Sequence, residues 1–504
     1  MRYLLIGLFL AAPLQAQTVP VFTDLDRAEK VRATAATVEQ KYREYAERQH
    51  MPGFAYGVVV DGELVYAGGF GYANIAGMVP ADTRSLFRIA SMSKSVTAMA
   101  ILQLRDSGKL SLDDPITRYL PETSALTYLT IDAPAITIRH LLTHSAGFPE
   151  DNPWGDRQLA DSDEELRELI AGGISFSNVA GIEYEYSNLG FALLGQIVQV
   201  VSGMDFREYT KAYIFEPLGM TDTVWEWESV SPQRLALGYD WVDDGWVNIP
   251  LEHHGAFGAM GGLITSIDDF TKYVALHLSA WPPRSDPDLG PLKRSSLREM
   301  QQPWRFAAVI PDFRYPSGRE CPSATAYAFG LRWMEDCEGR VIVGHSGGLP
   351  GFGSNWTMMP EYGLAVMSFD NVTYGGTSTL NTAVLDGIIA TAGLEPRQLP
   401  IPDVLETRKN QLVALLPDWK GAEETGIFAE NFFMDTRLSD IVQHSREIFA
   451  AAGAIQEVGE LVAENQLRGS FVLRGQKTDI LVFFTLSPER DPLIQQFRMT
   501  TLEK

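Results

Sequence analysis

The chain has 504 residues, of which 45% are hydrophobic and 21% are charged, and its formal net charge is −23 at pH 7. This length makes a single domain unexpected, and the composition is that of a folded globular protein. The negative charge argues against nucleic acid and anionic membrane surfaces as partners, but it does not select a substrate because a local pocket can oppose the overall sign.

Residues 1–16 have the features of a secretory signal peptide. Arg2 precedes a short apolar core, and small residues near Ala16 suit cleavage. The segment is too short for a transmembrane anchor, so we expect no membrane-spanning segment in the mature chain. We therefore expect export to a bacterial periplasm or beyond.

A helix and a hairpin are the first expected elements. Apolar or small residues at helical spacing predict a helix from about Asp26 to Gln49. Two strand-like runs follow at residues 54–60 and 63–68, and the Asp61-Gly62 pair between them is typical of a hairpin turn.

The tetrad Ser91-Met92-Ser93-Lys94 stands where an apolar run gives way to a helical pattern. A serine at the first turn of a helix has a free backbone N–H at the positive end of the helix dipole. A lysine three residues later lies on the same face, with its amine within reach of the serine oxygen. This arrangement suits an activated nucleophile, although Ser91 as an N-cap and Lys94 as a solvated residue is the favoured interpretation of an isolated S-x-x-K pattern.

Two histidine pairs are candidates for metal ligands. His140 and His144 are four residues apart, but no glutamate follows His140 as in H-E-x-x-H, and His253 and His254 are adjacent. Both pairs are interpreted as structural or substrate-facing. We expect no metal and no organic cofactor.

In the helical, loop-rich middle of the chain, the polar turn Tyr186-Ser187-Asn188 precedes another apolar helix. A lysine ammonium beside the Tyr186 phenol would lower its pKa and make the tyrosine a general base. Asn188 offers an amide that can bond both Lys94 and a substrate carbonyl.

The chain contains two cysteines, Cys321 and Cys337. In an oxidising compartment a disulfide between them would tie down a surface excursion, and two free thiols are the alternative. Neither cysteine is near a candidate catalytic motif, so cysteine catalysis is not expected.

His345-Ser346-Gly347-Gly348 follows a strand-like run at residues 340–344. Small residues on an edge strand let a substrate backbone pair with it, and the N–H groups of Ser91 and Gly348 could form an oxyanion hole. The stretch also fits G-x-S-x-G, the nucleophile elbow of α/β-hydrolases, with Ser346 as nucleophile. That elbow needs a helix after the strand, which the Pro- and Gly-rich residues 349–356 disfavour.

Further strands are expected at residues 354–359 and 364–370, with an apolar helix near residues 380–392. Together with the early strands they predict one sheet assembled from both ends of the domain. The active site would then lie between this sheet and the helical region.

The character of the chain changes after about residue 395. The Pro-rich start predicts a linker over residues 395–418. A helix near residues 439–452 and strand-like runs at residues 467–473, 478–486 and 493–500 predict a small α+β accessory domain over residues 419–504. Four aromatic residues of this part could line a binding groove, although a core role is commoner: Phe428, Phe432, Phe433 and Phe483.

The order S-x-x-K, Y-x-N, [K/H]-x-G resembles that of the serine penicillin-recognising hydrolases. Further stretches are similar to the branch that holds class C β-lactamases, D-Ala-D-Ala carboxypeptidases, D-aminopeptidases and related esterases. They are residues 87–91, 112–115, 138–147, 217–220 and 261–263.

This resemblance covers roughly residues 30–390. It implies an α+β, β-lactamase/transpeptidase-like fold over residues 17–394, with an antiparallel sheet flanked by helices plus a helical region. It also implies roles for the motif residues: catalysis for Ser91, Lys94 and Tyr186, and substrate binding for Asn188, His345, Ser346, Gly347 and Gly348.

His345 stands where β-lactam-cleaving relatives have the lysine of K-T-G, whose charge meets the substrate carboxylate. A histidine of ordinary pKa is mostly neutral near pH 7, so the exchange weakens a β-lactamase assignment. The resemblance implies an exported serine hydrolase that acts through an acyl-enzyme on ester or peptide bonds of small substrates, D-amino-acid peptides included. A β-lactamase and a non-catalytic protein that binds penicillin or a peptidoglycan fragment are the alternatives, and the oligomeric state is left open.

Overall fold

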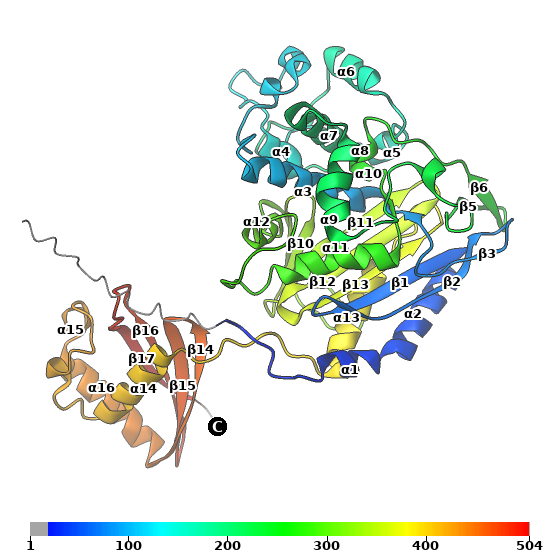
Figure 1. Cartoon of the computed structure of the whole chain (residues 1–504). Coiled ribbons are helices and arrows are strands. Elements are labelled where there is room, and N and C mark those ends of the chain that lie inside the picture. Colours follow the sequence, from blue (N-terminus) through cyan, green and yellow to red (C-terminus); the bar gives the residue numbers. More distant parts are fainter. Residues whose placement is uncertain (1–18, 503–504) are drawn as a thin grey trace, which may run out of the picture. The chain divides into compact units, whose positions relative to one another are not determined.

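The computed structural model describes residues 19–502, which form two compact units (Figure 1). The larger unit is Asp24–Pro396, and the smaller one joins the residues from Arg397 onward to the segment that ends at Thr23. The predicted signal peptide, residues 1–16, lies outside the described residues.

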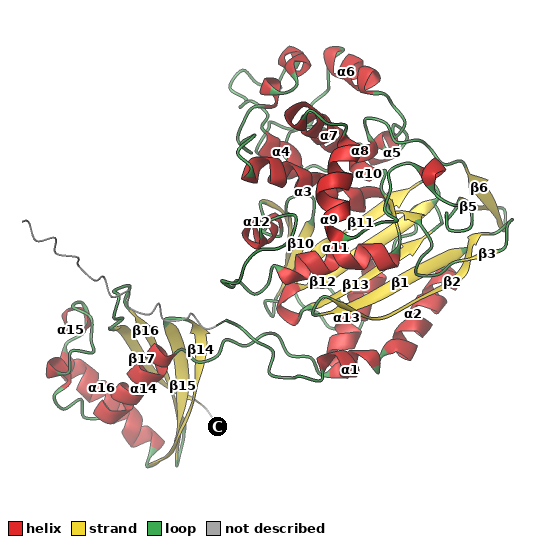
Figure 2. Ribbon diagram, in the orientation of Figure 1, coloured by secondary structure: helices red, strands yellow, loops and turns green. Residues whose placement is uncertain are grey.

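A nine-stranded antiparallel sheet is the centre of the larger unit (Figure 2). In spatial order its strands are β3 (Val79–Pro80), β2 (Glu63–Asn74), β1 (Gly53–Val60), β13 (Leu364–Asp370), β12 (Phe352–Met359), β11 (Val341–Leu349), β10 (Arg332–Asp336), β9 (Ser323–Tyr327) and β8 (Arg305–Ile310). β1 pairs with β13, beginning with Phe54 opposite Asp370, so the sheet is assembled from both ends of the unit as predicted. The turn from β1 to β2 has positive φ at Asp61 and Gly62, the geometry that an Asp-Gly hairpin requires.

Alternation along β1 separates two hydrophobic cores on the two faces of the sheet. The helices that cover these faces are α1 (Arg27–Arg32), α2 (Ala35–Arg48), α11 (Ile267–Ser279) and α13 (Ser378–Ala392). Because successive side chains of a strand point to opposite faces, Ala55 and Val59 join the core that includes α11, whereas Phe54 and Val58 join the core of α2 and α13.

The prediction of one continuous helix from Asp26 to Gln49 is wrong, because this segment forms two helices, α1 and α2. Both the N–H and the hydroxyl of Thr34 donate to the Val31 carbonyl, at 2.9 and 2.7 Å. A threonine hydroxyl that bonds the local backbone competes with the helical ladder, and the chain turns there.

The middle of the larger unit is helical. Its helices are α3 (Ser93–Asp106), α4 (Ile138–Leu142), α5 (Asn152–Gly155), α6 (Asp163–Ala171), α7 (Asn188–Ser202), α8 (Phe206–Thr210), α9 (Glu216–Leu218), α10 (Gly258–Gly261) and α12 (Arg294–Met300). Two small sheets complete the unit: β4 (Phe87–Arg88) with β7 (Ile264–Thr265), and β5 (Gly238–Val242) with β6 (Gly245–Ile249).

α3 and α7 pack against each other, and most of their residues are buried. Their contact brings the S-x-x-K segment beside the Tyr-Ser-Asn turn. Among residues 19–502 no single helix is long and apolar enough to cross a membrane; α7 together with Phe206–Leu218 passes a length and composition test as a pair bent by 78°.

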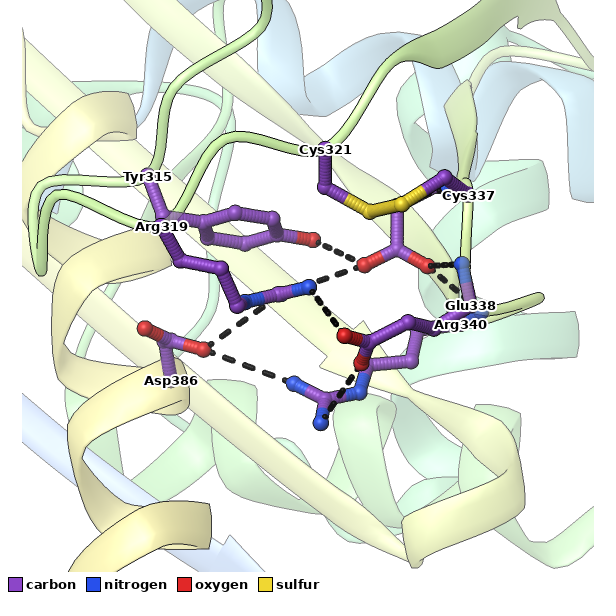
Figure 3. Close-up of a disulfide and its surroundings, with 8 residues drawn as sticks. Tyr315, Arg319, Cys321, Cys337, Glu338, Arg340 and Asp386 are labelled. Carbon is purple, nitrogen blue, oxygen red and sulfur yellow. Dashed lines mark hydrogen bonds and ion pairs between the residues drawn. A yellow bond between two sulfur atoms is a disulfide. The ribbon is translucent and has the colours of Figure 1, made fainter.

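Cys321 and Cys337 form a disulfide, which confirms the predicted bridge (Figure 3). Beside it, Arg319 forms ion pairs with Asp336 at 3.2 Å and with Asp386 of α13 at 3.6 Å. The disulfide and the ion pairs therefore fasten the connection between β8 and β9 to the end of β10 and to α13. One end of β10 is thus fixed, and its other end reaches the site described below.

The smaller unit is an α+β structure with its own core. Its elements are α14 (Asp403–Leu415), α15 (Phe432–Asp435), α16 (Leu438–Ala452), β14 (Ile455–Asn465), β15 (Arg468–Gly475), β16 (Asp479–Leu486) and β17 (Ile494–Leu502). The four strands form one antiparallel sheet in chain order. β14 was not predicted from the sequence, since its pairing with β15 is interrupted by bulges that break the apolar alternation.

The predicted linker over residues 395–418 is too long, because most of it is α14. Leu405 and Leu412 of this helix are fully buried in the same core as Trp419. The accessory unit therefore begins before residue 419. Phe432 is a core residue here and also lines a cavity of about 610 Å³ between α16 and β17.

Candidate active site

Ser91 lies in a 3₁₀ turn, Ala90–Met92, immediately before α3. The turn is held from both sides. The Ser93 hydroxyl donates to the Ala90 carbonyl at 2.7 Å, and the N–H of Leu263 donates to the same hydroxyl at 3.1 Å. Ser91 is 6% exposed and lines a cavity of about 250 Å³.

Lys94 is fully buried behind Ser91. Its Nζ lies 3.0 Å from Ser91 Oγ, 2.7 Å from Asn188 Oδ1 and 2.9 Å from the Met260 carbonyl oxygen. Burial lowers the pKa of Lys94 to about 7, although the carboxylates of Asp156 and Asp151 act in the opposite direction. An appreciable fraction of the lysine is therefore neutral near pH 7.

Tyr186 faces the same cavity, with Lys94 Nζ 4.9 Å from the centre of its ring. Burial raises the pKa of Tyr186 well above its usual value, and a hydrogen bond with the Ser91 hydroxyl and the charge of Arg332 offset this only in part. The expectation that Lys94 lowers the pKa of this phenol is therefore wrong for the resting site. In a buried site, desolvation disfavours both the ammonium and the phenolate, so the amine and the phenol are each driven toward the neutral form.

Asn188 is the first residue of α7 and is completely buried. Its Oδ1 receives the Lys94 bond, while its Nδ2 donates to Asn152 Oδ1 at 3.2 Å and lies 3.5 Å from Asp156 Oδ1. The backbone N–H of Asn188 donates to Asp151 at 2.6 Å. The amide is thus occupied inside the protein, and Asn152 and Asp156 stand between it and the cavity.

The four motif residues of β11, His345 to Gly348, differ in their position relative to the cavity. Ser346 and Gly348 line the cavity with Ser91. Gly347 lies against the turn that carries the serine, since a Cβ there would come within 2.2 Å of the Ile89 carbonyl oxygen. β10 pairs with β11 only as far as Gly344, so the edge of β11 beside the cavity has no strand on that side.

His345 is buried behind the cavity wall and is 2% exposed. Its Nδ1 lies 2.5 Å from the Ser346 carbonyl oxygen and its Nε2 lies 2.9 Å from the Tyr327 hydroxyl. Because a carbonyl can only accept, Nδ1 carries the proton and Nε2 accepts from the tyrosine. Burial lowers the pKa of His345 well below its usual value, so this side chain brings no positive charge to the site.

The nucleophile-elbow reading of Ser346 is excluded. β11 runs through Ser346 to Leu349, and the chain then turns directly into β12. The serine pairs with Asn355 in the middle of a hairpin, whereas an elbow needs a sharp turn into a helix.

His144 supports the Tyr-Ser-Asn turn. Its ring centre lies 4.2 Å from that of Tyr186, and its Nδ1 accepts a 3.0 Å hydrogen bond from the N–H of Ser187. Burial lowers its pKa well below the usual value, so it is neutral. Within residues 19–502 no group of three or more His, Cys, Asp or Glu side chains is placed to hold a metal ion.

The cavity wall also contains residues that sequence reasoning missed: Asn152, Pro153, Asp156, Arg332 and Tyr374. The Arg332 guanidinium lies 5.5 Å from the centre of the Tyr186 ring. The Tyr374 hydroxyl donates to Asp156 Oδ2 at 3.1 Å. The one available signal was the turn-rich stretch from Asp151 to Asp156, which carries two acids; nothing local singles out Arg332 or Tyr374.

The chain is similar to known proteins of one family. A family model described as Beta-lactamase matches residues 38–388. Protein flp of Staphylococcus aureus (strain COL) is 26% identical over 332 residues, which cover 65% of this chain and 61% of that protein. Penicillin-binding protein 4* of Bacillus subtilis (strain 168) is 34% identical over 186 residues, which cover 35% and 40% of the two chains. The matched region is less than two thirds of the length of these relatives.

Two solved structures have the same fold. The octameric penicillin-binding protein homologue from Pyrococcus abyssi aligns with a TM-score of 0.60 at 21% identity, over 92% of this chain and 99% of that chain. A penicillin binding protein from Bacillus halodurans aligns with a TM-score of 0.53 at 23% identity, over 69% and 98%. The predicted β-lactamase/transpeptidase-like α+β fold is thereby confirmed. With the family match across most of its length, the chain belongs to the Beta-lactamase family, the serine hydrolases related to β-lactamases and penicillin-binding proteins.

Proposed function

We propose that this protein forms an acyl-enzyme on Ser91 and hydrolyses ester or peptide-like bonds of small substrates. The observation that carries the proposal is the 3.0 Å separation of Lys94 Nζ and Ser91 Oγ, with a lysine whose pKa burial lowers to about 7. A base with a pKa near the working pH can remove the serine proton efficiently.

The surroundings of Lys94 direct its lone pair toward the serine. Its other two partners, Asn188 Oδ1 and the Met260 carbonyl oxygen, are acceptors that cannot donate. A neutral amine with its two N–H bonds on these oxygens presents the lone pair to the third partner, Ser91. The serine O–H then donates to Nζ, and attack on a carbonyl transfers that proton to Lys94.

Tyr186 supplies the proton for the leaving group. It stays protonated because burial raises its pKa, so its hydroxyl can donate as the bond to the leaving group breaks. The ammonium of Lys94 then restores the tyrosine proton, which leaves both groups neutral as before. Because Ser91, Lys94 and Tyr186 interact closely, their titration belongs to the set rather than to one residue.

The negative charge that develops on the carbonyl oxygen needs donors. Ser91, in the turn before α3, and Gly348, beyond the last residue of β11 that pairs with β10, line the same cavity, and their N–H groups are the proposed donors. Each donor of an oxyanion hole contributes roughly 3–4 kcal/mol to transition-state stabilisation.

Arg332 indicates which charge the substrate carries. His345 is neutral, so Arg332 is the cation that faces the cavity from the sheet side. A guanidinium suits a carboxylate through paired hydrogen bonds. This favours substrates with an acidic group on the side of Tyr186, such as peptides, and it also keeps β-lactams, which carry a carboxylate, as a second candidate.

Export is part of the proposal. The signal-like residues 1–16 motivate it, and the disulfide between Cys321 and Cys337 supports it because such bonds persist in oxidising compartments. Finding Met1 retained on protein purified from its host would contradict export.

The test is labelling and turnover of the full chain. A fluorophosphonate probe should label the wild type, Ser346→Ala should be labelled as well, and Ser91→Ala should not. A panel of p-nitrophenyl esters, D-amino-acid amides and a chromogenic cephalosporin then ranks the substrate classes. Labelling that persists in Ser91→Ala would refute the assignment, and trapping of penicillin without any turnover would show a binding protein instead of a hydrolase.

A further inference from the structure

The wall of the cavity contains an acid that the chemistry above does not use. Asp156 lines the cavity although only 2% of its surface is exposed. Its oxygens have one good hydrogen bond, from the Tyr374 hydroxyl at 3.1 Å, and one long contact of 3.5 Å with the Asn188 amide. A carboxylate can accept about four hydrogen bonds, so Asp156 has acceptor capacity to spare.

No cation of the described residues is bonded to this carboxylate. Lys94 acts on it electrostatically, but its Nζ contacts Ser91, Asn188 and Met260 instead. A buried charge without a bonded partner is unfavourable, and burial accordingly raises the pKa of Asp156 to about 6. It is still mostly ionised near pH 7, where a cationic group entering the cavity would relieve the cost.

Asn152 extends the same wall. It is four residues before Asp156, so the two side chains lie on one face of the turn formed by α5. Asn152 Oδ1 accepts from Asn188 Nδ2 at 3.2 Å, and the residue also lines the cavity. The wall therefore offers acceptor oxygens to a group that has several N–H donors, which is the chemistry of an ammonium group.

The wall adjoins the proposed oxyanion hole. Arg332 lies over Tyr186, which protonates the leaving group in the proposed reaction. Asp156 is hydrogen-bonded to Tyr374, whose ring lies beside Gly348 of the proposed oxyanion hole.

We propose that Asp156, Asn152 and Tyr374 form a subsite for a protonated amine of the substrate. The inference rests on the proposed function, because it names the substrate class of the same site: amides and esters of amino acids with a free amino group.

The experiment compares two ligands that differ in one group. Alaninamide carries an ammonium where lactamide carries a hydroxyl, and each is titrated calorimetrically, in D and L forms, into full-length Ser91→Ala at about pH 7, where the amine is mostly protonated. We expect one stereoisomer of alaninamide to bind about 10- to 100-fold tighter than its lactamide counterpart, the range for a charge-assisted hydrogen bond.

Two further variants in the same background locate the effect. Asp156→Asn, which keeps the shape of the side chain, should abolish the preference. Glu168→Gln removes an exposed negative charge from α6 without lining the cavity, and it should keep the preference.

Equal affinity for alaninamide and lactamide, or a preference that survives Asp156→Asn, would overturn the proposal. An equal loss of affinity for both ligands in Asp156→Asn would also overturn it, because that is the result expected of a residue that merely positions Asn188. The comparison uses a variant without the nucleophile, so its outcome is independent of the labelling of Ser91 that tests the proposed function.

Discussion

The protonation of Lys94 gives the sharpest test of the proposed chemistry. Burial lowers its pKa from 10.5 to about 7, a change of roughly 5 kcal/mol in the balance between ammonium and amine. At pH 7 an ordinary lysine is neutral in only about three molecules per ten thousand, whereas about half of Lys94 is neutral, so the site holds on the order of 10³ times more free base.

The sign of the expected pH dependence follows from the base being the deprotonated form. Labelling of Ser91 by a fluorophosphonate should be slow at low pH, rise about tenfold between pH 6 and pH 8 as Lys94 loses its proton, and then level off. The measurement is the second-order rate constant of labelling of the full chain from about pH 5.5 to 10.5, with unfolded protein as the control for reactivity of the probe itself.

Two variants separate the lysine from the tyrosine. Lys94→Arg cannot deprotonate, so it should lose the rise and most of the rate, whereas Tyr186→Phe should keep a midpoint near pH 7. A rate that continues to rise above pH 9 and loses this rise in Tyr186→Phe would refute the reasoning, since the base would then be the Tyr186 phenolate.

Three other perturbations follow from the packing. Replacing both Cys321 and Cys337 by serine should lower the free energy of unfolding by about 3 kcal/mol, the value for a loop of this size, as measured by urea denaturation; an unchanged midpoint would contradict it. Asp151→Ala leaves the buried N–H groups of Asn188 and Leu189 without their acceptor and should cost roughly 2–4 kcal/mol in the same assay, with Asp151→Asn less affected. Gly347→Ala should slow Ser91 labelling by about 10²-fold, because the added methyl group displaces the neighbouring turn. Labelling at the normal rate would contradict this, since the turn would then accommodate the methyl group without moving Ser91.

Much of the larger unit could be predicted from the sequence. The strand-like runs at residues 54–60 and 364–370 and the Asp-Gly turn are local patterns, and the structure confirms them. Prediction failed at Thr34, where a side chain bonds the backbone, and over residues 403–415, where a Pro-rich start concealed a helix with two leucines in the accessory core. In both places the decisive contact is made by one or two residues, too few to dominate a pattern.

The candidate site likewise has features that the sequence predicts and features that it does not. The spacing of Ser91 and Lys94 places hydroxyl and amine on one helical face whatever surrounds them, because it depends only on the helical repeat. By contrast, the protonation of Lys94 and Tyr186 depends on how much water the rest of the fold excludes, and there the sequence-based expectation had the wrong sign for the tyrosine.

The sequence by itself therefore determined the candidate nucleophile and its neighbouring lysine, which depend on short-range spacing, and the order of the motifs indicated the family fold. Only the tertiary structure decided which groups face the substrate. It buried Asn188 and His345 and placed Asp156 and Arg332 in the wall, because burial, charge and approach are set by segments that meet from distant parts of the chain.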